Sequence, residues 1–249
     1  FPGQQLRIPG LPRAAPPRLP ALQQPRLGLA MSVAISADLP ALGAVWYYVW
    51  DYCRPPGCVP MARDLQWPPP GRHPPCPRLL LAGNEPNAVE PFGAPLTPGQ
   101  AASRTRALEA ACPQTTLIVG GVSADDWSGA GGWGSGVNWL RAFLAEYRAQ
   151  AGQPFAQILA VHCYTQNDAG YCIGKLAEMR RQYTGPMWLT EFGVISGDPA
   201  QFAALLDYAC RKFQRVAAYT NRQPHTGQGW ELPPGVELVA ADGRLNPAG

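Results

Sequence analysis

Beyond Leu27 the chain alternates short apolar runs with stretches whose apolar residues recur on one helical face, at spacings of roughly 25 to 40 residues. The runs that predict β-strands cover residues 27–33, 44–50, 58–61, 78–83, 116–121, 158–164, 187–192 and 216–220. The later runs are continuous rather than alternating, as expected for parallel strands buried on both faces. Strands and helices that alternate in this way indicate repeated βα units.

Helices are predicted between several of these strands, over residues 98–111, 138–150 and 199–213. The first follows a capping box formed by Thr97 and Gln100, with Pro98 at the first helical position. The second repeats apolar residues along one face, and the third opens on an Asp-Pro pair. Recognisable helix starts therefore support the βα interpretation.

Eight strands with intervening helices in a chain of 249 residues fit the α/β class, as a (β/α)8 TIM barrel over residues 27–249. The alternative is an open doubly wound sheet. It is disfavoured because no Gly-x-Gly-x-x-Gly follows the first strand and no Gly-x-x-x-x-Gly-Lys-Ser/Thr occurs. Residues 1–26 hold seven of the 29 prolines and four arginines with little apolar periodicity, which predicts an extended arm or linker before a single domain.

The charge balance argues against two classes of partner. The formal net charge is only +3, and the 20 basic residues are scattered among 17 acidic ones rather than gathered into a stripe, so we expect no nucleic acid. No run approaches eighteen apolar residues, so we expect no transmembrane helix and no membrane partner. The expected state is a monomer.

The seven cysteines are odd in number, so at least one stays unpaired in a monomer. Cys53 and Cys58 flank a turn, and Cys163 and Cys172 bracket a polar loop, so both pairs could close small disulfides; buried free thiols are the alternative. Disulfides would indicate a secreted or extracytoplasmic protein, although the chain starts without the basic and apolar regions of a signal peptide. Cys-x-x-Cys is absent and the three histidines are widely separated, so we expect no metal.

Two glutamates directly follow predicted strands. Glu85 comes after the run at 78–83, and Glu191 lies at the end of the run at 187–192. Reactive groups of parallel barrels sit at the C-terminal ends of strands, although either acid could instead pair with an arginine there. Two carboxyls facing one pocket are what glycoside hydrolysis requires, with about 5–5.5 Å between them for retention and about 6.5–9.5 Å for inversion.

Aromatic residues are plentiful enough to line a sugar cleft. Trp46 and Tyr48 share one face of a predicted strand, and Trp127 and Trp133 lie in a glycine-rich loop after the fifth strand. The strand aromatics could instead fill the barrel.

The sixth predicted strand carries a second candidate pair. His162 and Tyr164 are two residues apart and share a face, whereas Cys163 points toward the helices. His162 could alternatively be a core histidine.

These residues carry a family resemblance. Asn84, Glu85 and Pro86, with Thr190, Glu191 and Phe192, resemble the two catalytic signatures of glycoside hydrolase clan A. The order of further segments is similar to that in family 128, the endo-β-1,3-glucanases, over residues 46–50, 59–61, 83–87, 161–164 and 188–192.

The resemblance implies a retaining mechanism, with Glu85 as acid/base and Glu191 as nucleophile, and it implies that Asn84 binds the hydroxyl next to the reacting carbon. Glu191 then needs donors that keep it ionised, and Tyr164 is the expected one.

The chain also departs from the family pattern. Val49 stands where the family often has Asn, and Cys163 where it often has Trp. The eighth strand lacks the tryptophan that often floors the sugar site in the clan, and Tyr219 or Asn221 is expected to replace its contact. The departures concern substrate identity more than reaction class.

The sequence therefore predicts a retaining glycoside hydrolase that cleaves β-glycosidic bonds in a glucan, with β-1,3-glucan favoured, an oligo- or polysaccharide substrate, and no cofactor. One alternative is a barrel that binds glycans without cleaving them. Another is a clan A hydrolase acting on a different β-linked glycan. A serine or cysteine hydrolase is disfavoured because the Gly-x-Ser-x-Gly elbow is missing.

Overall fold

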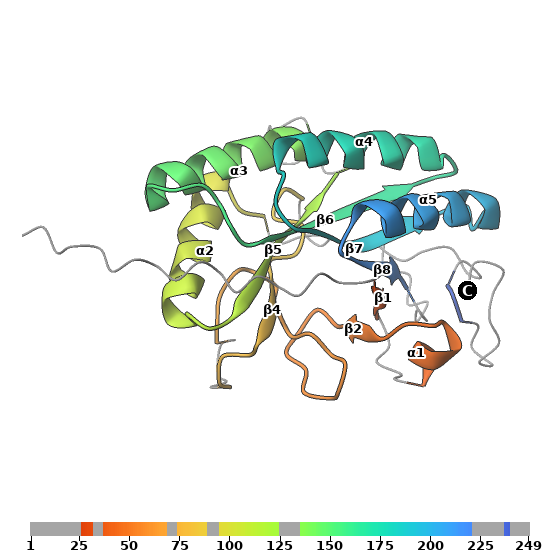
Figure 1. Cartoon of the computed structure of the whole chain (residues 1–249), viewed down its shortest axis with the longest axis horizontal. Coiled ribbons are helices and arrows are strands. Elements are labelled where there is room, and N and C mark those ends of the chain that lie inside the picture. Colours follow the sequence, from red (N-terminus) through yellow and green to blue (C-terminus); the bar gives the residue numbers. More distant parts are fainter. Residues whose placement is uncertain are drawn as a thin grey trace, which may run out of the picture.

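The computed structural model describes residues 26–31, 37–68, 74–88, 95–124, 135–220 and 237–239. Eight parallel strands run through them in the order β2-β1-β8-β7-β6-β5-β4-β3 (Figure 1). Their bounds are β1 Arg26–Ala30, β2 Trp46–Tyr48, β3 Met61–Ala62, β4 Leu79–Ala82, β5 Thr116–Ser123, β6 Ile158–Thr165, β7 Met187–Val194 and β8 Arg215–Tyr219. The predicted arm lies outside the described residues apart from Arg26, which begins β1.

The sheet nearly closes on itself. Just before β3, Cys58 forms a parallel bridge with Tyr47 of β2, the Tyr47 N–H donates to the Gly57 carbonyl, and the Val59 N–H donates to the Tyr47 carbonyl. This pairing joins the two ends of the strand order, so the eight strands make the predicted (β/α)8 barrel.

The described helices are α1 Asp38–Ala41, α2 Pro98–Ala111, α3 Gly136–Ala151, α4 Ala169–Gln182 and α5 Pro199–Lys212. Long helices follow β4, β5, β6 and β7, and within the described ranges none follows β2 or β3 (Figure 1). Helix α4 is not among the predicted helices. Its buried residues recur every three or four positions, but Gly170 and Gly174 lower the helix propensity of the segment. None of the described helices is long and apolar enough to cross a lipid bilayer.

Side-chain caps set the helix starts where the sequence indicated them. Thr97 accepts a hydrogen bond from the Gln100 N–H, and the Gln100 side chain accepts one from the Thr97 N–H, so the predicted capping box is formed. Asp198 caps α5 by accepting from the N–H groups of Ala200 and Gln201. These caps satisfy backbone donors that the first helical turn cannot pair internally.

The apolar side chains form two layers. One fills the barrel interior and includes Trp46, Tyr48, Leu81, Ile118 and Trp188. The other lies between the strands and the helices. Because β5, β6 and β7 contribute to both layers, their residues are buried almost throughout, which explains the continuous apolar runs of the sequence. The C-terminal ends of the strands are therefore held on a rigid scaffold.

Candidate active site

Glu85 lies just beyond β4 in an unusual backbone conformation. Its φ angle is 42°, in the left-handed region that side-chain-bearing residues rarely adopt. The Glu85 N–H donates to the Gly121 carbonyl at 3.0 Å, and the Ala88 N–H donates to the Glu85 carbonyl at 2.9 Å. The surrounding hydrogen bonds hold this conformation, as is common for strained residues at functional sites.

Bulges bring the other residues of the site into register. Between β5 and β6 the pairing skips Gly121, and between β6 and β7 it skips Thr190. After the second skip, His162 lies opposite Glu191. A β-bulge re-aims the side chains that follow it, and here both bulges come directly before the site.

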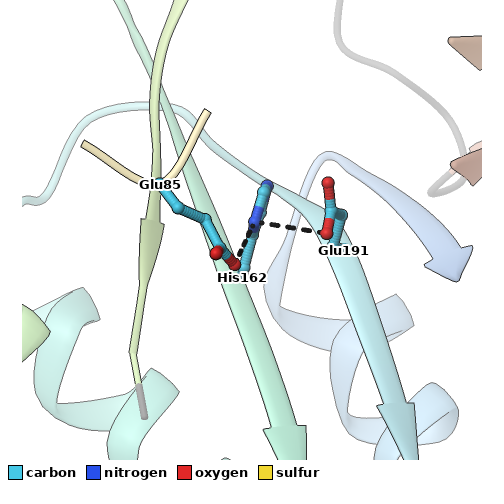
Figure 2. Close-up of side chains that lie close together, drawn as sticks. All are labelled: Glu85, His162 and Glu191. Atoms are coloured by element: carbon cyan, nitrogen blue, oxygen red, sulfur yellow. Dashed lines mark hydrogen bonds and ion pairs between the residues drawn. The ribbon is translucent and has the colours of Figure 1, made fainter. Parts of the chain in front are cut away.

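His162 lies between the two glutamates (Figure 2). Its Nδ1 is 3.0 Å from Glu85 Oε1 and 3.5 Å from Glu191 Oε2. The His162, Glu85 and Glu191 side chains are only 1%, 12% and 6% exposed. An oxygen of Glu85 and an oxygen of Glu191 lie within 4.8 Å of each other. The two carboxyls thus face one another across a single imidazole in a largely dry site.

Glu191 accepts hydrogen bonds from three aromatic residues. Tyr48 donates to Oε1 at 2.6 Å, Trp50 Nε1 approaches the same oxygen at 3.1 Å, and Tyr164 donates to Oε2 at 2.7 Å. Burial, followed by the negative charge of Glu191, raises the pKa of Tyr48 and that of Tyr164 well above the usual value. Both hydroxyls therefore stay protonated and donate to the Glu191 carboxyl group.

The expected bond from Tyr164 is present, and the structure gives Tyr48 the same role. Tyr48 is fully buried, so it contacts the glutamate rather than standing on a cleft wall. Trp46, two residues earlier, is 3% exposed and packs against Tyr48 and Trp188 inside the barrel. Its position leaves no free face on which a sugar could stack, so the barrel-filling alternative applies to it.

Asn84 and Tyr219 complete the described rim of the site. The Asn84 Oδ1 accepts a hydrogen bond from Trp50 Nε1 at 3.1 Å, which ties it to the donor set of Glu191. Tyr219 packs edge-on against Trp50 and against Tyr164, with ring centroids 5.7 Å apart in each case. Among the described residues of β8, Tyr219 therefore supplies the aromatic side chain next to the paired glutamates.

Three predicted site residues cannot be placed. Trp127, Trp133 and Asn221 lie outside the described residues. Their expected contacts with substrate stay predictions.

Sequence reasoning assigned no role at the site to Trp50 or Gly121. Trp50 shares the face of Tyr48, so the alternation that selected Tyr48 could have found it. Gly121 has a φ of 60°, and a Cβ atom there would lie 3.0 Å from His162 Nε2. The signal for Gly121 was a pair of glycines inside an apolar strand, which indicates a bulge or a close approach.

Substituting Gly121→Ala should destabilise the protein and lower its activity. The left-handed backbone costs an alanine about 1–2 kcal/mol, and the new methyl group would press on the His162 ring. The free energy of unfolding, measured by denaturant titration, should fall by about that amount, and hydrolytic activity should fall with it. Gly174→Ala is the matched control, because nothing lies within 4 Å of its added Cβ and alanine favours its helix. Equal stability of the two variants would contradict the assignment.

Glu85, His162 and Glu191 are also the group that could hold a metal ion in the described part of the chain, since one donor atom from each lies within 4.8 Å of the others. Carboxylate and imidazole ligands suit several divalent metals. However, Glu191 already accepts three hydrogen bonds, and a carboxylate offers about four acceptor positions. These three hydrogen bonds leave about one acceptor position of Glu191 open to an incoming group.

Comparison with known proteins agrees with the glycoside hydrolase chemistry that the sequence predicts. A family model described as the glycosyl hydrolase catalytic core matches residues 39–227. No curated protein matches the chain.

Solved structures share the fold over most of their length. A GH128 subgroup II endo-β-1,3-glucanase from Pseudomonas viridiflava is 27% identical, with a TM-score of 0.65 over 89% of this chain and 94% of that chain. Its counterpart from Sorangium cellulosum is 23% identical, with a TM-score of 0.66 and the same coverage. A subgroup IV endo-β-1,3-glucanase from Lentinula edodes is 17% identical, with a TM-score of 0.67 over 90% of this chain and 97% of that chain.

The family match spans well over half of the chain and contains both glutamates, which the barrel brings face to face around His162. The chain therefore belongs to the glycosyl hydrolase catalytic core family, as an O-glycosyl hydrolase whose barrel is similar to those of family GH128.

Proposed function

We propose that this protein is a retaining glycoside hydrolase that cleaves β-1,3-glucan, with Glu191 as nucleophile and Glu85 as acid/base. The observation that carries the proposal is the short separation of the two carboxyls, whose nearest oxygens lie within 4.8 Å. A separation of about 5–5.5 Å between the carboxyl groups is typical of retaining enzymes, whereas inverting enzymes need room for a water molecule between the sugar and the base.

In the first step, Glu85 gives its proton to the glycosidic oxygen while a Glu191 oxygen attacks the anomeric carbon. The bond from that carbon to the leaving sugar breaks, and an ester to Glu191 forms. In the second step, Glu85 takes a proton from water as the water attacks the same carbon. The ester bond breaks, Glu191 returns as a carboxylate, and Glu85 is protonated again, so two inversions give net retention.

The contacts of each glutamate suit these roles. Tyr48, Trp50 and Tyr164 each donate a hydrogen bond to Glu191, which orients its oxygens for attack. Glu85 Oε1 lies 3.0 Å from His162 Nδ1. One proton can therefore lie between these two atoms both when Glu85 acts as the acid and when it acts as the base. His162 thus remains a hydrogen-bond partner of Glu85 both when Glu85 donates a proton and when it accepts one.

The structural neighbours support β-1,3-glucan as the substrate. The 27% identical protein from Pseudomonas viridiflava is an endo-β-1,3-glucanase, and another neighbour, from Amycolatopsis mediterranei, was solved with laminaritriose. In our proposal Asn84, held by Trp50, binds the hydroxyl next to the anomeric carbon, and Tyr219 contacts the sugar from β8.

Hydrolysis assays on a panel of glucans test this function. The protein is incubated with linear β-1,3-glucan, β-1,4-glucan and mixed-linkage glucan, and reducing ends are measured together with the chain lengths of the products. We expect cleavage of the β-1,3-glucan, with proton NMR showing the β anomer as the first product. Initial release of the α anomer would contradict retention. Binding of glucan with no product from any substrate would instead favour a glycan-binding barrel.

The cysteines support a location outside the cytoplasm. Disulfides join Cys53 to Cys58, Cys76 to Cys112 and Cys163 to Cys172, as expected for the first and third pairs, and Cys210 is the free thiol. Persistent disulfides are typical of oxidising compartments, so we place the protein among secreted or extracytoplasmic hydrolases. Mass spectrometry of the alkylated, unreduced protein should find one reactive thiol, and seven would contradict this placement.

A further inference from the structure

The disulfide between Cys163 and Cys172 is built into the strand that carries two site residues. Cys163 lies between His162 and Tyr164 on β6, and its side chain points to the layer between strands and helices. Cys172 lies in the first turns of α4. Both cysteines are completely buried. The disulfide thus joins β6 to α4 on the outer face of the strand. At the same level, on the inner face, His162 and Tyr164 contact the two glutamates.

This part of β6 pairs further with β7 than with the described residues of β5. Among the described residues, its pairing with β5 ends where Ser123 lies opposite His162, whereas its pairing with β7 continues to Thr165. Tyr164 is in that last stretch, opposite Gly193. The disulfide adds a covalent attachment to α4 at this level.

The site is sensitive to the placement of this stretch. Tyr164 donates to Glu191 at 2.7 Å, and His162 Nδ1 lies 3.0 Å from Glu85. A displacement of about 1 Å at a catalytic site can lower the rate by about 100-fold. A disulfide on the outer face of β6 therefore affects the geometry of both glutamates, because it fixes the positions of His162 and Tyr164, which contact them.

We propose that Cys163 and Cys172 are positioning residues, whose disulfide holds Tyr164 and His162 against the catalytic pair and so makes the activity depend on oxidative folding. The inference rests on the proposed hydrolytic function. It concerns Cys163, which lies between the two site residues of β6.

The test compares a variant that lacks this disulfide with a control variant that lacks a different one. In the variant Cys163→Ala/Cys172→Ala, kcat on β-1,3-glucan should fall by about tenfold or more while KM changes little, because the reacting groups are displaced and the rest of the cleft is not. The control variant Cys76→Ala/Cys112→Ala lacks the bond that joins the segment before β4 to the end of α2. That bond closes 36 residues rather than 9, so its loss should lower stability more while leaving kcat unchanged.

A double-mutant cycle identifies the route. If the disulfide acts through Tyr164, its removal should cost far less in a Tyr164→Phe background than in the wild type. Additive effects would overturn the proposal, as would an unchanged kcat or an equal loss in the control. Absence of activity in the wild type would instead contradict the hydrolytic function itself.

A second measurement applies if the double variant does not fold. Wild-type protein is reduced stepwise with a phosphine, and the released thiols are mapped by mass spectrometry as activity and circular dichroism are followed. Activity lost in step with thiols at Cys163 and Cys172, before helical signal is lost, supports the proposal. Full activity with this pair reduced overturns it.

Discussion

Replacing Glu191 with glutamine should lower kcat on β-1,3-glucan by about 10⁴-fold or more, which corresponds to about 5.5 kcal/mol of transition-state stabilisation. The amide has nearly the shape of the carboxylate but cannot form the glycosyl ester. Tyr48 and Trp50 both donate to one oxygen of Glu191, and an amide oxygen at that position can still accept from them. The fold and glucan binding should therefore survive while turnover is lost.

The Glu191→Gln experiment has three measurements. Steady-state kinetics give kcat, calorimetric titration with a β-1,3-linked oligosaccharide gives affinity, and thermal unfolding reports the fold. Glu146→Gln is the matched control. Glu146 is exposed on α3, so its substitution removes the same charge from a position outside the site. Hydrolysis by Glu191→Gln at the wild-type rate would exclude Glu191 as the nucleophile.

Replacing Glu85 with alanine should have the second-largest effect, and its form depends on the substrate. Loss of a general acid costs about 10²- to 10⁴-fold with a glucan, whose leaving sugar needs a proton. With an aryl glycoside carrying a good leaving group, the first step needs no acid, so the glycosyl-enzyme should accumulate. Mass spectrometry should then detect the protein with one glycosyl unit attached.

Azide provides the diagnostic for Glu85. In Glu85→Ala the missing side chain leaves space beside His162, where a small anion can replace water as the second nucleophile. Turnover should recover with added azide, and the product should be a β-glycosyl azide. Glu85→Gln keeps the volume of the side chain and should not recover. No rescue of the alanine variant, or an α-glycosyl azide from it, would contradict the retaining mechanism.

Much of the fold and part of the site were predictable from local patterns. The continuous apolar runs identified β5, β6 and β7 because strands buried on both faces have no polar alternation. The capping box before α2 was readable because its contacts span only three residues. Helix α4 was harder, since two glycines lower its propensity and tertiary packing on β6 stabilises it instead.

The strand aromatics show where alternation stops being informative. Trp46, Tyr48 and Trp50 share one face of the same segment, so period-two reasoning treats them alike. In the barrel they lie at successive depths, and only Tyr48 and Trp50 reach Glu191. Depth along a barrel axis depends on how neighbouring strands are staggered, which is a property of the closed sheet.

By itself, the sequence determined that two glutamates end apolar strands of a parallel barrel, because strand type and strand end are local properties of the chain. Only the tertiary structure decided how the pair works. Glu85 and Glu191 are more than a hundred residues apart, and their separation depends on barrel closure and on the bulges at Gly121 and Thr190. A bulge changes register by one residue without changing the apolar pattern, so no periodicity could reveal that His162 lies between the two carboxyls.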